Sequence, residues 1–325
     1  MSRAREFADL AGSADAGGIT GRNVLINGEF QVWQRGTSSS SNGYRTADRW
    51  RLNLSGASAT ASQGTFANGQ TAVPGNPQFY MALDVTTGND NCGWQYRIED
   101  TQKFNSDVYT LSFWAKSATP RVMTVNSHTY DSSADVDDDN TVSPSTFTPT
   151  SSWQKFTFKI TFSSMPNVGA FASGDYTHIG INQGSDTSTA AWKLDLALVQ
   201  FEKGEQATPF EHRSFADELR RCQRYHQRFT GVSNGRVGFG TKTSATGARC
   251  VIPFNTAMRA TPSHSITGTP RFETGAAAQN VSSINTSGAN TLVGGFDVVT
   301  ASGGAQNDPG VLDMGDGGYI FDAEL

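Results

Sequence analysis

Short runs of alternating apolar and polar residues recur through most of the chain. In residues 109–115, Tyr109, Leu111 and Phe113 fall on one face, and residues 153–162 alternate in the same way. Successive side chains of a strand point to opposite sides, so these runs predict half-buried β-strands. Their density predicts two sheets packed face to face, a β-sandwich of the jelly-roll type. The main strands expected before residue 213 are 50–54, 79–85, 92–98, 108–115, 121–125, 154–161, 178–182 and 191–200.

One amphipathic helix interrupts this β-pattern, at residues 214–229. Ser214 is a suitable cap, and the acids of the first turn precede the arginines, which suits the helix dipole. The apolar positions have heptad spacing over two heptads, which fits either self-association or packing on a neighbouring sheet. Both interpretations are open. The residues of this predicted seam are Phe215, Leu219, Cys222, His226 and Phe229.

The fold class expected is all-β, with a jelly-roll β-sandwich joined by this helix to a smaller C-terminal β-domain. Residues 1–22 form a glycine-rich leader that is either frayed or docks onto another protein. Residues 23–213 form the sandwich, 214–229 the connecting helix and 230–325 the C-terminal domain. The last part has few large apolar side chains, so we expect oligomerisation to add to its stability.

Composition and charge exclude several classes of protein. A net charge of −5 without a clustered basic face argues against nucleic-acid binding. An aromatic content of 10 % is too high for a disordered chain. There is no apolar run of membrane-spanning length and no signal peptide. Cys92, Cys222 and Cys250 are too scattered for a zinc site or a disulfide framework, so we expect reduced, buried thiols.

Catalytic motifs are also missing from the sequence. It has no G-x-S-x-G elbow, no H-E-x-x-H pair and no phosphate loop. Paired carboxylates for glycosidic cleavage come from distant strands, and no pair stands out. Residues 135–140 begin like a calcium loop but lack its turn glycine and its final glutamate. We therefore expect a non-enzymatic protein.

Two segments resemble tail-fibre and related virion proteins of tailed bacteriophages. The first is NVLINGEFQVWQRGTS at 23–38, followed by YRTADRW at 44–50. The second, at 193–229, is a strand ending in ATPFE that leads into a helix containing ELRRCQRY. The resemblance covers roughly residues 23–262 and is closer at its two ends than in the middle.

This resemblance implies a jelly roll similar to the carbohydrate-binding modules of glycan-degrading enzymes. It also implies a virion structural protein, most often a homotrimer. We accordingly expect a tail fibre, spike or decoration protein that is assembled in the host cytoplasm and binds other virion proteins through its leader. The alternatives are a host-receptor-binding protein whose jelly roll binds surface polysaccharide, and a polysaccharide depolymerase.

Sugar binding needs exposed aromatic rings beside amides and carboxylates. The polar companions expected are Gln95, Asn126 and Asp131. Each aromatic candidate has the alternative of filling the sandwich core. The sugar-binding modules that the chain resembles hold a calcium ion between their first and last strands, and the nearest matches by position are Glu29 and Asp195. The aromatic candidates, with Trp94 and Tyr96 as the preferred pair, are Trp33, Tyr80, Trp94, Tyr96, Trp114 and Tyr130.

Overall fold

The chain folds into two compact units in the computed structural model, one of Met1–Glu218 together with Leu325 and one of Leu219–Glu324. The boundary lies within α2 (Phe215–Gln223), the only α-helix among the described residues. The predicted leader lies outside the described residues except for its last two positions. The residues that the structure describes are 21–89, 91–132, 136–163, 174–184, 188–230, 235–275, 278–286 and 288–325.

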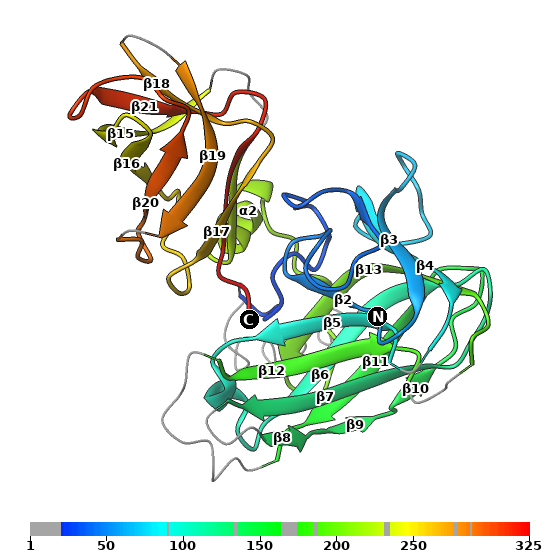
Figure 1. Ribbon diagram of the computed structural model, residues 1–325. Coiled ribbons are helices and arrows are strands. Elements are labelled where there is room, and N and C mark those ends of the chain that lie inside the picture. The colour runs from blue at the N-terminus through cyan, green and yellow to red at the C-terminus, as the bar shows by residue number, and fades with distance from the viewer. Residues whose placement is uncertain are drawn as a thin grey trace. The chain divides into compact units, whose positions relative to one another are not determined.

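The first unit is a sandwich of two antiparallel sheets (Figure 1). The seven-stranded sheet has the order β1-β3-β4-β13-β6-β11-β9. The six-stranded sheet has the order β10-β7-β12-β5-β2, with β8 paired to β7. The elements are β1 (Ser38–Ser39), β2 (Trp50–Asn53), β3 (Ser58–Thr65), β4 (Phe79–Thr87), β5 (Gly93–Ile98), η1 (Thr101–Phe104), β6 (Val108–Lys116), β7 (Met123–Asp131), β8 (Val136–Asp139), β9 (Thr141–Ser143), β10 (Thr146–Phe147), β11 (Gln154–Thr161), β12 (Tyr176–Asn182) and β13 (Trp192–Lys203).

The apolar residues whose alternation predicts β6 also lie in the core of the sandwich. Leu111 and Phe113 are fully buried, and the Phe113 ring stacks on Phe158 of β11 at 5.3 Å between centroids. Trp50 and Trp94 enter the same core from the six-stranded sheet, at 2 % and 0 % exposure. Burial of side chains of this size contributes about 1.5–3 kcal/mol each.

The second unit contains a closed barrel and a small separate sheet. The barrel has the order β15-β16-β20-β19-β18-β21, and the sheet has the order β14-β22-β17. Closure leaves no free strand edge, which suits a domain with few large apolar residues. The predicted all-β class is thus confirmed, with a sandwich, one short helix and a small C-terminal β-domain. The strands are β14 (His226–Thr230), β15 (Arg236–Ser244), β16 (Gly247–Pro253), β17 (Ser263–Thr267), β18 (Arg271–Thr274), β19 (Ala278–Thr286), β20 (Val293–Thr300), β21 (Pro309–Asp313) and β22 (Gly318–Asp322).

The helix is shorter than the sequence predicts. It ends at Gln223, and β14 begins at His226, so His226 and Phe229 lie on a strand. That strand pairs with β22 over five residues, beginning with His226 opposite Asp322. The prediction of helix up to residue 229 is therefore wrong, because long-range pairing determines the second half of the segment.

The predicted self-association seam is broken for the same reason. Cys222 and His226 are buried, at 0 % and 3 % exposure, so they offer no surface to another chain. Phe215, at the other end of the seam, is 55 % exposed, and Leu219 is half-buried. The cap is formed as expected, since the Ser214 hydroxyl accepts a hydrogen bond from the Asp217 backbone N–H at 3.2 Å.

Candidate functional site

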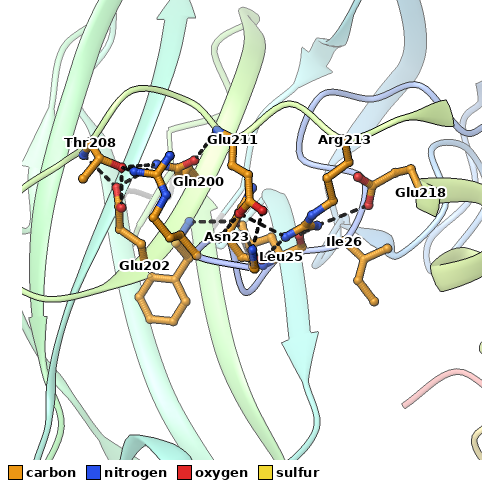
Figure 2. A network of polar contacts seen from close by, with 12 residues as sticks. Asn23, Leu25, Ile26, Gln200, Glu202, Thr208, Glu211, Arg213 and Glu218 are labelled. Atoms are coloured by element: carbon orange, nitrogen blue, oxygen red, sulfur yellow. Dashed lines mark hydrogen bonds and ion pairs between the residues drawn. The ribbon is translucent and has the colours of Figure 1, made fainter. Parts of the chain in front are cut away.

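The two segments that resemble virion proteins meet in one polar network of the first unit (Figure 2). Asn23 joins the start of the sandwich to its last strand, β13. Its side-chain Nδ2 donates to the Val199 carbonyl at 3.1 Å, and its Oδ1 accepts from the Phe201 N–H at 3.0 Å. The side-chain amide of Asn23 thus hydrogen-bonds to the backbone of residues 199 and 201, as a neighbouring strand would.

Charged residues extend this network to the beginning of α2. The Glu211 carboxylate accepts from the backbone N–H groups of Gly21 and Asn23, at 2.5 and 2.6 Å. Arg213 donates to the carbonyls of Asn23 and Leu25, and its guanidinium pairs with Glu211 at 3.6 Å and with Glu218 at 3.5 Å. Burial alone would raise the pKa of Glu211, but these backbone donors and the Arg213 charge lower it overall.

A second part of the network holds the segment that follows β13 in place through hydrogen bonds. The Glu202 carboxylate accepts from the Thr208 backbone N–H at 2.8 Å and from its hydroxyl at 2.6 Å. Gln200 donates to Glu202 at 2.7 Å and accepts from the Glu211 N–H, also at 2.7 Å. These polar groups hold one another and the backbone, so the network fastens the two ends of the sandwich and presents no binding surface.

The structure places the preferred aromatic pair inside the core. Trp94 and Tyr96 point between the sheets at 0 % and 1 % exposure, and the Tyr96 hydroxyl accepts from the Ile26 N–H at 2.8 Å. A ring without exposed surface cannot stack on a sugar. The choice of these two residues as platforms is therefore corrected, and they are core residues.

Trp114 and Tyr130, two more of the aromatic candidates, are half-buried, but they lie on different sheets. Trp114 belongs to β6 in the seven-stranded sheet, and Tyr130 belongs to β7 in the six-stranded sheet. Trp114 and Tyr130 both point away from the core, because the side chains next to them in the strands, Phe113 and Thr129, are buried. The structure does not bring Trp114 and Tyr130 into one site.

The predicted calcium ligands do not form a common cluster either. Glu29 accepts from the Gln31 side chain at 2.8 Å and lies 3.1 Å from His212 Nδ1. Asp195 pairs instead with Lys116 at 3.4 Å; burial raises the pKa of Asp195, and Lys116 opposes that rise. Across the described ranges, no group of three or more His, Cys, Asp or Glu side chains is placed to hold a metal ion.

The outward side of the six-stranded sheet carries a different set of side chains, which we call the outer face. It includes the residues of β2, β5, β7 and β12 that point away from the core. The register aligns Arg51 with Gln95, Arg97 with His178, and Gln95 with Gly180. The outer face consists of Arg51, Asn53, Gln95, Arg97, Thr124, Asn126, His128, Tyr130, Tyr176, His178, Gly180 and Asn182.

Aromatic rings form one part of the outer face. Tyr130 and Tyr176 lie opposite each other on β7 and β12, with ring centroids 5.0 Å apart. His128 and His178, the next outward pair, are stacked at 4.1 Å. The Arg97 guanidinium lies 4.2 Å from the centre of the Tyr176 ring, and a backbone oxygen of Leu325 accepts from Arg97 Nη1 at 3.0 Å. The half-buried tyrosines offer ring surface next to hydrogen-bonding groups.

Amides form the second part. Asn182 donates to Asn126 Oδ1 at 3.0 Å across the strands. This close approach requires glycine at position 180, because a Cβ there would lie 2.0 Å from Asn126 Oδ1. Gln95 accepts a hydrogen bond from the Arg51 guanidinium. The predicted companions Gln95 and Asn126 therefore lie on the outer face.

His178 is the residue of the outer face that most needs an explanation. It is 3 % exposed, and neither ring nitrogen has a hydrogen-bond partner among the residues that the structure describes. Burial, with the charges of His128, Arg97 and Arg51, lowers the pKa of His178 well below its ordinary value, so it is neutral near pH 7. A neutral imidazole offers one donor and one acceptor, and leaving both unmade costs about 1–3 kcal/mol per group.

The comparisons with known proteins concern the fold. No family model matches the chain, and no curated protein matches it. Similar solved structures include a CBM4 structure, with 21 % identity over 55 % of this chain and 98 % of that one, at a TM-score of 0.36. Another is the CBM22-1 xylan-binding domain of Xyn10C from Paenibacillus barcinonensis, with 12 % identity over 53 % of this chain and 94 % of that one, at a TM-score of 0.32.

One similar structure comes from a virus. The enzymatically active domain of tailspike protein 4 from bacteriophage CBA120 has 12 % identity over 56 % of this chain and 21 % of that one, at a TM-score of 0.33. Similarities at these levels say nothing about the activity of this chain. In the described part of the chain, no helix is both long and apolar enough to cross a membrane.

Proposed function

We propose that the sandwich is a non-catalytic polysaccharide-binding module and that the outer face of its six-stranded sheet is the binding site. The observation that carries this proposal is the pair of half-buried tyrosine rings, Tyr130 and Tyr176, with centroids 5.0 Å apart and the Arg97 guanidinium 4.2 Å from the Tyr176 ring. Binding sites for small organic ligands combine aromatic surface with a few oriented polar groups, and the outer face offers both.

We further propose that the protein acts on a bacteriophage particle as a structural part that contacts host surface polysaccharide. Support comes from the resemblance of residues 23–50 and 193–229 to virion proteins, together with the network that joins these two segments. The side chains of these two segments that belong to the network bond to one another and to the backbone, so their role is structural. Binding is then left to the outer face, where the particular polysaccharide is selected.

Affinity electrophoresis of the full chain through gels containing neutral or acidic polysaccharides tests the binding function. We expect at least one polymer to retard the protein. Replacing both Tyr130 and Tyr176 with alanine should weaken that binding about tenfold or more, since each ring buried against a sugar contributes on the order of 1–2 kcal/mol.

Trp114→Ala is the matched control, because it removes a half-buried outward ring from the other sheet. Its binding should equal that of the unmodified protein. If no polymer in the panel retards the protein, or if Trp114→Ala loses binding while the double tyrosine variant retains it, the proposal is overturned.

A further inference from the structure

Two arginines lie together on one part of the outer face, while Asp139 of β8 lies opposite His128 at the other edge of the sheet. Arg51 and Arg97 lie on neighbouring strands, β2 and β5, and both point outward. Burial, and then the charge of Arg97, lower the pKa of Arg51, so the two guanidinium groups affect each other. Two adjacent like charges on a partly buried surface are unfavourable unless a negative charge compensates them.

Among the described residues, no Asp or Glu side chain lies within 4.0 Å of the Arg51 or Arg97 guanidinium nitrogens. Arg97 donates to an oxygen of Leu325, the last residue of this sequence, whose carboxylate supplies a negative charge. Arg51 has only a neutral acceptor, Gln95 Oε1, so it is the guanidinium without a charged partner among the described residues. By contrast, Arg213 in the polar network has two carboxylates within 3.6 Å.

The neutral histidine lies next to these charges. His178 is directly opposite Arg97 in the sheet, and the fields of Arg51, Arg97 and His128 all disfavour its protonated form. His178 therefore adds no positive charge of its own, and Arg51 is the group placed to bind an anion. Guanidinium groups match planar and tetrahedral oxyanions through paired N–H donors.

We infer that the outer face binds an anionic polysaccharide, with Arg51 holding the oxyanion of a sugar unit. This inference rests on the proposed function and names its ligand class. The shared chemistry is an oxyanion on a sugar, which a uronic-acid carboxylate or a sulfate ester can supply. Tyr130 and Tyr176 then provide ring surface for the adjoining sugars.

The closing experiment compares polygalacturonate with its methyl ester, which has the same sugar backbone without the charge. We expect the full chain to bind the free acid about tenfold or more tightly, because hydrogen bonds to a charged group are the stronger ones. Arg51→Gln should remove most of this preference and leave methyl-ester binding within about threefold. Arg51→Lys keeps the charge and should retain part of the preference. Dextran sulfate provides a third arm, and tighter binding there would assign the oxyanion as a sulfate.

Lys155→Gln is the control, because it removes an exposed positive charge from β11 in the other sheet. It should leave the preference for the acid unchanged. Equal binding of the acid and the ester, with both weakened in the double tyrosine variant, would overturn this inference and leave the polysaccharide-binding proposal standing. Loss of the preference in Lys155→Gln but not in Arg51→Gln would place the anion on the other sheet and also overturn it.

Discussion

Arg213→Met should destabilise the first unit by about 3–5 kcal/mol, as expected when one partner of a buried ion pair is removed. The Arg213 side chain is 7 % exposed and holds both Glu211 and Glu218. Methionine fills a similar volume, so the loss comes from two uncompensated carboxylates and two unpaired carbonyls. Urea unfolding followed by tryptophan fluorescence measures this effect, because all six tryptophans lie in the first unit.

Arg221→Ala is the matched control for this prediction. It removes an exposed arginine from α2, eight residues further along the chain, and should change the stability by less than about 0.5 kcal/mol. If Arg213→Met were as mild as Arg221→Ala, the network would not be what fastens the two ends of the sandwich.

Trp94→Ala should cost the first unit about 3–5 kcal/mol, the usual range for removing a large aromatic ring from a core. The ring has no exposed surface and belongs to the main hydrophobic cluster of the sandwich. Thermal unfolding monitored by the remaining tryptophans gives the measurement.

Tyr130→Ala is the comparison, since that ring is half-buried on the outer face and its removal leaves no internal cavity. We expect a loss below about 1 kcal/mol there. The opposite order, with a stable Trp94→Ala protein that no longer binds sugar, would restore Trp94 as a binding platform.

Local sequence pattern predicted eight strands of the sandwich and missed β1, β3, β8, β9 and β10. In β6, Leu111 and Phe113 alternate with polar residues, and the alternation gives both the strand and its buried side. β5 is also apparent from alternation, but aromatic side chains suit a core and a binding face equally. What separates the core side chains of β5 from its surface side chains is which alternate positions point inward. Trp94 and Tyr96 point inward, so Gln95 and Arg97, which alternate with them along the strand, had to point outward.

The rest of the outer face depends on contacts that no local pattern contains. His128 and His178 are 50 residues apart and meet only through the register of β7 with β12. The sequence shows two dispersed histidines there, and the stacking and burial appear only in the folded sheet. The end of α2 is a similar case, because the pairing of His226 with Asp322 joins residues 96 positions apart.

The broken seam removes one of the reasons for expecting an oligomer, and the oligomeric state itself stays a prediction. Cys222 and His226 are buried within the chain, and the barrel of the second unit closes on itself without exposed edges. The account of function therefore rests on the outer face of one chain.

The most direct test of that account is nuclear magnetic resonance of selectively labelled histidine side chains during titration with galacturonate oligosaccharides. The chain has only five histidines, at 128, 178, 212, 226 and 264, so each ring can be assigned by substitution. We predict that the half-buried His128 ring shifts most, that His178, which stacks on it, follows, and that His212 and His264 stay unchanged. Saturable binding that shifts His212 or His264 and leaves His128 unmoved would contradict the assignment of the outer face as the binding site.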